Sequence, residues 1–71
     1  MRTYESTARL FEFALGKLRI TPSELSRRLH RSTSTIGRYR HGQSAAPSDV
    51  LNNLARLCGY DTLAAFYRDA L

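Results

Sequence analysis

The chain has 71 residues, enough for one small domain. Its apolar content of 42% is that of a folded protein, which excludes wholesale disorder. Its formal net charge of +5 points to a polyanionic partner, provided that the charge is concentrated in one part of the chain.

The chain lacks the usual features of secreted and membrane proteins. Its single cysteine, Cys58, allows no internal disulfide and no cysteine-based metal site, which fits a reducing compartment. No run of 18 apolar residues exists, and charged residues (Glu5, Arg9, Glu12) interrupt any signal-peptide pattern. We therefore expect a cytoplasmic protein with no cofactor and no metal site.

The first predicted helix begins near the N-terminus, where Thr3 or Ser6 is expected to cap it. Its buried stripe recurs at three- and four-residue spacing, at Thr7, Leu10, Phe11, Ala14 and Leu18. Phe13 points off this stripe, and two interpretations stay open: a partly exposed aromatic at the domain edge, or a contact with another protein. Residues 17–20 are expected to form the connection to the next helix.

A second, short helix is predicted to follow Thr21 and to reach about Leu29. Thr21 is expected to cap it, and Pro22 suits the first helical position because its missing N–H costs nothing there. Glu24 stands three residues after Thr21, which completes the pattern of a capping box. Leu25 and Leu29 share the face that packs.

A third helix is predicted from about Thr33 to Arg40, after a turn at residues 30–31 and with Ser32 as its cap. A helix turns by 100° per residue, which places Thr33, Ser34, Gly37, Arg38 and His41 on one face. The side chains of this face are mostly small and polar, and Arg38 adds one long cation. The opposite face holds Thr35, Ile36 and Tyr39, with Tyr39 expected in the core. Gly42 is expected to end the helix in the left-handed conformation.

The surplus positive charge falls in this part of the chain. Five arginines and both histidines lie between Leu25 and Ser48, without an acidic residue among them. The rest of the chain carries as many acidic as basic side chains. The absence of a compensating acid favours phosphate binding over the alternative interpretation, a solvated charged face.

Two more helices are predicted after a loop of small residues. Ser48 is expected to cap the fourth, whose stripe is Val50, Leu51, Leu54, Leu57 and Cys58, and Gly59 stops it. Asp61 is expected to cap the fifth helix. No strand pattern is present, so the predicted fold is a single all-α domain, a compact five-helix bundle.

The order and spacing of these elements carry a resemblance. The residues concerned are Leu25-Ser26, Leu29, the STSTI sequence of residues 32–36, Gly42, Pro47-Ser48, Leu54-Ala55, Leu57 and Gly59-Tyr60. Over about residues 7–66 the chain resembles the Cro/C1-type helix-turn-helix family, also called the XRE family. The resemblance implies a lambda-repressor-like bundle whose third helix enters the DNA major groove.

Four positions depart from the pattern of that family, and one of them is Arg31, which stands where the turn usually has an apolar residue. Pro22 replaces a glutamine that helps to anchor the DNA backbone. His30 stands where the turn often has glycine, so we expect a strained or altered turn. Arg40 replaces a usual acid, so an ion pair common in the family is missing or reversed.

The polar face of the third helix and the resemblance together define the candidate DNA-binding site. We expect base contacts from Thr33, Ser34, Gly37 and Arg38; helix capping and solvent exposure are the alternative for Thr33 and Ser34. We expect phosphate contacts from Thr21, Arg27, Arg28, Arg31, Arg40, His41 and Gln43.

The expected function is that of a double-stranded DNA-binding transcriptional regulator, a repressor that occupies a palindromic operator as a homodimer. The fifth helix, residues 61–71, is the candidate dimer surface through Leu63, Phe66, Tyr67 and Leu71; the alternative is that it only covers the core. No catalytic set of side chains and no glycine-rich phosphate loop is apparent. A protein-interaction module, such as an antitoxin or anti-activator, is the alternative function.

Overall fold

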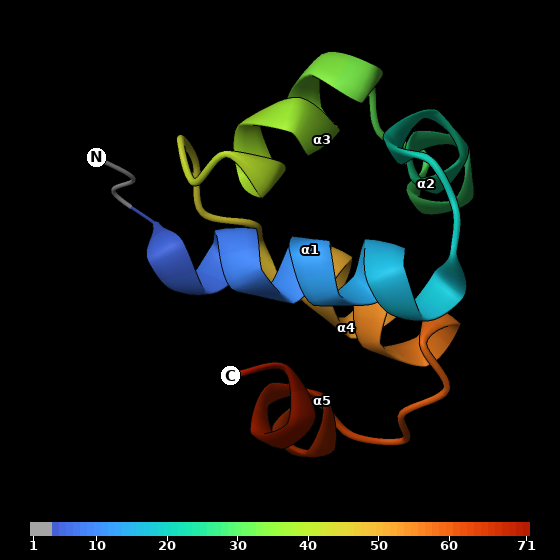
Figure 1. Ribbon diagram of the computed structural model, residues 1–71, viewed down its shortest axis with the longest axis vertical. Coiled ribbons are helices and arrows are strands. Elements are labelled where there is room, and N and C mark those ends of the chain that lie inside the picture. Colours follow the sequence, from blue (N-terminus) through green and yellow to red (C-terminus); the bar gives the residue numbers. More distant parts are fainter. Residues whose placement is uncertain (1–3) are drawn as a thin grey trace.

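The computed structural model describes residues 4–71, and all regular structure within them is helical (Figure 1). The helices are α1 (Glu5–Leu18), α2 (Pro22–Leu29), α3 (Thr33–Arg40), α4 (Ser48–Leu57) and α5 (Leu63–Ala70). The predicted all-α class and the predicted bounds of α2 and α3 are confirmed. None of the helices in the described part of the chain is long and apolar enough to cross a membrane.

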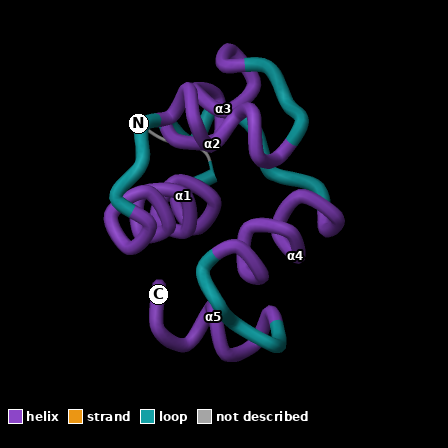
Figure 2. The backbone as a smooth tube through the Cα atoms, turned by 90° about the vertical axis from the view of Figure 1, so that its right-hand side faces the viewer, coloured by secondary structure: helices purple, strands orange, loops and turns teal. Residues whose placement is uncertain are grey.

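Helix α1 crosses the middle of the molecule and contacts α3, α4 and α5 (Figure 1). The pair α2 and α3 lies on one side of α1, and α5 lies on the opposite side. Figure 2 shows the same separation after a quarter turn. The arginine-rich part of the chain and the C-terminal helix therefore occupy opposite ends of the molecule.

One hydrophobic cluster holds the five helices together. Tyr39 is buried in it, with its ring centroid 5.2 Å from that of Phe11, which confirms the prediction that Tyr39 belongs to the core. Cys58 is buried in the same cluster. Burial raises the pKa of the Cys58 thiol above its ordinary value, although nearby Lys17 acts in the opposite direction. The thiol is thus held in its unreactive protonated form.

Aromatic rings join α1 to α5. Phe66 of α5 has no exposed surface, and its ring centroid lies 6.0 Å from that of Phe13 and 5.5 Å from that of Tyr60. The prediction that Phe66 lies on a dimer surface is therefore wrong, because its ring fills the core of its own protomer. Phe13 is half-buried in this aromatic group, so its ring serves the contact between α1 and α5.

The two predicted caps of α2 and α3 are confirmed. Thr21 Oγ1 accepts a hydrogen bond from the backbone N–H of Glu24 at 3.1 Å, and Ser32 Oγ accepts one from the backbone N–H of Thr35 at 3.1 Å. Each hydroxyl thereby satisfies one of the N–H groups that a helix start leaves without a partner.

The predicted starts of the other helices are wrong by one or two residues. Helix α1 follows Tyr4 without a side-chain cap, so Ser6 lies inside it, and Thr3 lies outside the described residues. Ser48 is the first residue of α4 and not its cap, because the chain enters through Pro47 in an extended conformation. The cap of α5 is Thr62 instead of Asp61, and its hydroxyl accepts the N–H of Ala65 at 3.1 Å.

Four helix ends use the left-handed conformation, at Arg19, His30, Gly42 and Gly59. Helix α1 runs to Leu18, which lies inside the predicted connection of residues 17–20, and Arg19 then adopts φ 54°. Gly42 has φ 70°, as predicted, and its carbonyl accepts the N–H of Tyr4 at 3.0 Å. This last bond ties the end of α3 to the start of α1.

His30 ends α2 with φ 56°. Its N–H donates to the carbonyl of Arg27 at 3.3 Å, and the next N–H, of Arg31, donates to that of Ser26 at 3.0 Å. The altered turn expected for His30 thus consists of one residue in a conformation that favours glycine, which leaves the bonds of the helix end intact.

We expect His30→Gly to raise the free energy of unfolding by about 0.5–1 kcal/mol. Relief of the left-handed strain, about 1–2 kcal/mol, exceeds the extra backbone entropy that glycine loses on folding, about 0.5–1 kcal/mol. Urea unfolding measures the change. The matched control is Arg31→Gly, at a neighbour without positive φ, which should give no gain. Equal effects in the two variants would mean that His30 is unstrained.

Candidate nucleic-acid interface

One face of α3 is open to solvent. Ile36 and Tyr39 point into the core, whereas the opposite face presents four exposed residues and the half-buried Gly37. The exposed residues are Thr33, Ser34, Arg38 and His41. The predicted orientation of the helix is thus confirmed, and the predicted base-contacting residues lie together on one surface.

Gly37 is not required by the packing of the protein. A Cβ atom added at this position meets no atom within 4 Å, and the same holds for Gly16 of α1. Glycine inside a helix costs about 1 kcal/mol relative to alanine. The protomer therefore bears this cost at both glycines without a packing benefit.

Replacement of Gly37 by alanine should separate stability from binding. We expect Gly37→Ala to raise the free energy of unfolding by up to about 1 kcal/mol, and to weaken binding to duplex DNA if α3 lies closely against it. Gly16→Ala is the matched control, with the same gain and unchanged binding. Urea unfolding and mobility shift measure the two effects. Duplex binding that is equal in both variants would argue against close approach at Gly37.

A short polar network runs along α3. Thr35 Oγ1 lies 2.9 Å from Ser32 Oγ and accepts a hydrogen bond from Arg38 Nη2 at 3.3 Å. The helical pattern placed Thr35 on the packing face with Ile36 and Tyr39. Its side chain is only half-buried, so Thr35 lies at the edge of that face. These hydrogen bonds could have been predicted from the sequence, because the three positions are three residues apart and such neighbours lie side by side on a helix.

Glu24 pairs with two of the arginines of α2. Its carboxylate oxygens lie 2.6 Å from Arg27 Nη2 and 3.2 Å from Arg28 Nε. The hydrogen bonds from Arg27 and then Arg28 hold the pKa of the Glu24 carboxyl below its ordinary value. The predicted capping box is therefore only half formed: the hydroxyl of Thr21 caps the helix, while the carboxylate of Glu24 bonds the arginines.

A second acid meets the turn between α2 and α3. Arg31 Nη2 lies 3.2 Å from Asp49 Oδ2, in the first turn of α4. Although no acid lies between Leu25 and Ser48, the residues directly before and after that segment are Glu24 and Asp49. The predicted absence of charge compensation is thus wrong for three of the five arginines.

The two arginines of α3 differ from those three. Arg38 is exposed, and its bond goes to the neutral hydroxyl of Thr35. Arg40 is half-buried, and its buried Nε has no hydrogen-bond partner within the described part of the chain. Arg38 is therefore the cation that the exposed face of α3 offers most directly, whereas part of the Arg40 guanidinium is withdrawn towards the protein.

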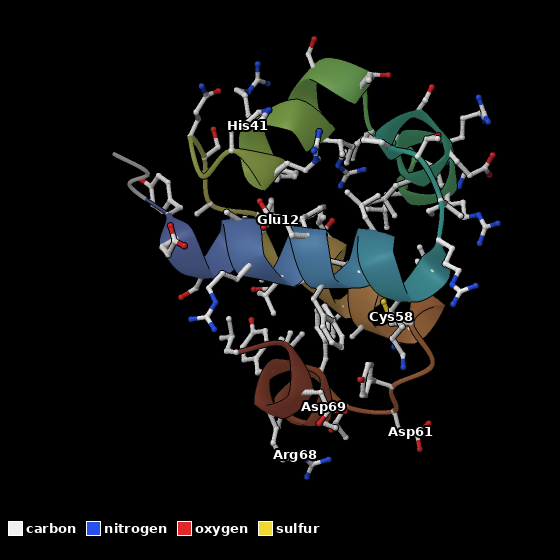
Figure 3. All side chains as sticks on the ribbon, viewed as in Figure 1. Glu12, His41, Cys58, Asp61, Arg68 and Asp69 are labelled. Atoms are coloured by element: carbon white, nitrogen blue, oxygen red, sulfur yellow. The ribbon has the colours of Figure 1, made fainter. Side chains whose placement is uncertain are left out.

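Three further predicted phosphate contacts are also open to solvent. His41 and Gln43 are exposed, and His41 lies at the end of α3 that is farther from α2 (Figure 3). Thr21 is exposed at the start of α2. We call the whole area the α2–α3 surface, which consists of Thr21, Arg27, Arg28, Arg31, Thr33, Ser34, Gly37, Arg38, Arg40, His41 and Gln43.

Removal of the Glu24 charge should strengthen non-specific binding to DNA. We expect Glu24→Gln to release Arg27 and Arg28 and so to raise the affinity for duplexes of any sequence. The binding should also depend more steeply on salt: the slope of log binding constant against log salt concentration should grow by about 0.9 for each phosphate gained. Titration of random-sequence duplex at several salt concentrations measures both effects. Asp61→Asn is the control with the same change of net charge, far from α2 and α3 (Figure 3). Identical gains in both variants would contradict a local role for Glu24.

The same substitution has a consequence at acid pH. Because the folded pKa of Glu24 is depressed, its ion pairs stabilise the protein fully above the ordinary value of 4.5 and lose this effect as pH falls through the folded value. Glu24→Gln should lack this part of the acid dependence.

Other kinds of site find no support in the part of the chain that the structure describes. No three histidine, cysteine, aspartate or glutamate side chains of residues 4–71 come together as a group able to hold a metal ion. On α5, Leu63 and Tyr67 are half-buried, and Leu71 just beyond it is 46% exposed. These three residues are what remains of the predicted dimer surface.

Comparisons with known proteins do not identify the chain. No model of a protein family matches it, and no curated protein and no solved structure matches it either.

Proposed function

We propose that the protein is a sequence-specific regulator of transcription that binds double-stranded DNA in the cytoplasm, with α2 and α3 as a helix-turn-helix in a lambda-repressor-like bundle. The observation that carries the proposal is the exposed face of α3, which is small and polar and presents Arg38, for which residues 4–71 supply no acidic partner. The surrounding arginines and the resemblance to the Cro/C1-type family support it.

The exposed face of α3 has the chemistry that a DNA groove accepts. The major groove is wide enough for an α-helix, and its base edges offer hydrogen-bond acceptors and donors. Thr33, Ser34 and Gly37 are small enough to let the helix axis approach the bases. Arg38 supplies the guanidinium that can donate two hydrogen bonds to guanine, the commonest specific contact.

The arginines of α2 and the turn are suited to phosphates despite their acidic partners. Arg27 and Arg28 are exposed, and the pair of Arg31 with Asp49 is also open to solvent. Exposed ion pairs of this kind contribute little to stability because water screens them, so a phosphate oxygen can replace a carboxylate at little cost. These residues, with Thr21, Arg40, His41 and Gln43, hold the duplex while α3 contacts the bases.

In this proposal the protein is a repressor that binds as a homodimer, because one recognition helix covers too few base pairs for useful specificity. Both copies of α3 must face the same duplex, and α5 lies on the opposite side of α1 from α3 (Figures 1 and 2). The two-fold axis therefore runs along the direction from α5 to α3, and the pairing surface is a flank of the molecule. Leu63, Tyr67 and Leu71 remain available to such a surface.

Selection of bound sequences from a pool of random duplexes, at about 150 mM salt, tests the proposal. We expect an inverted repeat whose half-sites lie about 10 bp apart, or a multiple of that distance. Binding that depends on salt but enriches no sequence would refute sequence-specific regulation. It would turn the search to a protein partner, as for an antitoxin or anti-activator of similar fold.

A further inference from the structure

The hydroxyl of Thr35 is fully engaged as an acceptor. It receives one hydrogen bond from Ser32 Oγ at 2.9 Å and one from Arg38 Nη2 at 3.3 Å, which occupies both of its lone pairs. Its backbone N–H in turn donates to Ser32 Oγ at 3.1 Å. Because Thr35 is β-branched and half-buried, few rotamers are open to it. Its oxygen therefore has a fixed position on α3.

This oxygen is the partner of the one arginine that the exposed face of α3 presents. A free arginine side chain samples many rotamers, and it loses this conformational freedom when it is held in one of them. The bond to Thr35 engages one Nη group, while the guanidinium keeps further N–H donors. Arg38 is thus partly ordered before any DNA arrives, which lowers the cost of binding.

The partner of Arg38 differs in kind from those of the arginines of α2. Glu24 holds Arg27 and Arg28 by full negative charge, and a phosphate must displace it. Thr35 is neutral, so it can orient Arg38 without competing electrostatically with a base acceptor.

We propose that Thr35 is a positioning residue: it aims the guanidinium of Arg38 and thereby sharpens the discrimination between base sequences. The inference rests on the proposed function, since it assigns Thr35 a role in contacts that Arg38 makes with DNA. It predicts an effect on specificity and none on the generic attraction between the arginines and phosphates.

Thr35→Val tests this role, because it removes the hydroxyl and keeps the branched shape. The probe is the duplex recovered by the wild-type protein from the random pool, compared with a scrambled duplex. We expect affinity for the recovered duplex to fall roughly 3- to 10-fold, the net value of one hydrogen bond, with unchanged affinity for the scrambled one. Thr35→Ser, which keeps the oxygen, should restore most of the loss. Thr35→Ala serves the same test if the valine variant does not fold.

A double-mutant cycle with Arg38→Ala isolates the coupling. If Thr35 acts through Arg38, Thr35→Val has no further effect in the Arg38→Ala protein. Equal losses in both backgrounds, or equal losses on both duplexes, overturn the proposal. If the wild-type protein enriches a sequence and Thr35→Val binds it as tightly, only the role of Thr35 fails. If no sequence is enriched, the proposed function fails and the role of Thr35 fails with it.

Discussion

Truncation of Phe66 to alanine is expected to lower the free energy of unfolding by about 3–5 kcal/mol. The side chain has no exposed surface, and its ring packs against those of Phe13, Tyr60 and Tyr67 at centroid distances of 5.5–6.3 Å. Alanine leaves a cavity where α1 and α5 meet. A domain of this size is stable by about 4–10 kcal/mol, so the substitution removes a large part of the total.

Urea unfolding followed by circular dichroism measures this loss. Leu71→Ala is the control, since it also shortens an apolar side chain at the C-terminal end, but one that is 46% exposed. Phe66→Leu should fall between the two. If Phe66→Ala lowers the free energy of unfolding by less than about 1.5 kcal/mol, as volume-conserving substitutions do, the ring of Phe66 does not fill the core as described. A test of dimer formation should therefore leave Phe66 unchanged and alter Tyr67 and Leu71.

Arg38→Ala is expected to weaken binding to the selected duplex about 5- to 150-fold, corresponding to about 1–3 kcal/mol for a bidentate contact with guanine. Non-specific affinity should fall much less, because a single positive charge is removed from an arginine-rich surface. Arg38→Lys keeps the charge and loses the planar fork of donors, so it should lose most of the discrimination and keep the non-specific binding.

Mobility shift on the selected and scrambled duplexes measures both affinities. Arg68→Ala is the matched control: it removes the same charge from an exposed side chain of α5, at the opposite end of the molecule (Figure 3). A loss of the same size in Arg38→Ala and Arg68→Ala would show that only net charge matters, and it would remove α3 from the interface.

The parts of the fold that depend on neighbours in the sequence could be predicted. The caps at Thr21 and Ser32 involve hydrogen bonds over three residues, and the exposed and buried faces of α3 follow from the helical repeat. The start of α5 was harder, because Asp61 and Thr62 are adjacent and both are good caps. The conformation of the entering chain decides between them, and residue type does not encode it.

Contacts between distant segments could not be predicted. The burial of Phe66 depends on α1, which brings Phe13 to it from 53 positions away in the sequence. The ion pair of Arg31 with Asp49 depends likewise on how α4 packs beside the turn. The pairs of Glu24 are a different case, since spacings of three and four residues on one helix are a sufficient signal for them.

The central place of α1 has a consequence for synthesis of the protein. α1 leaves the ribosome before α5, but Phe13 of α1 packs against Phe66 of α5, and Arg9 Nη2 bonds the carbonyl of Leu71, 62 positions later. At about 5–20 residues per second, roughly 3–12 s separate the emergence of these two partners. α2 and α3 contact each other locally and can associate within that time. The side of α1 that contacts α5 therefore stays uncovered for seconds in the nascent chain, long enough for a chaperone to bind it before the core closes.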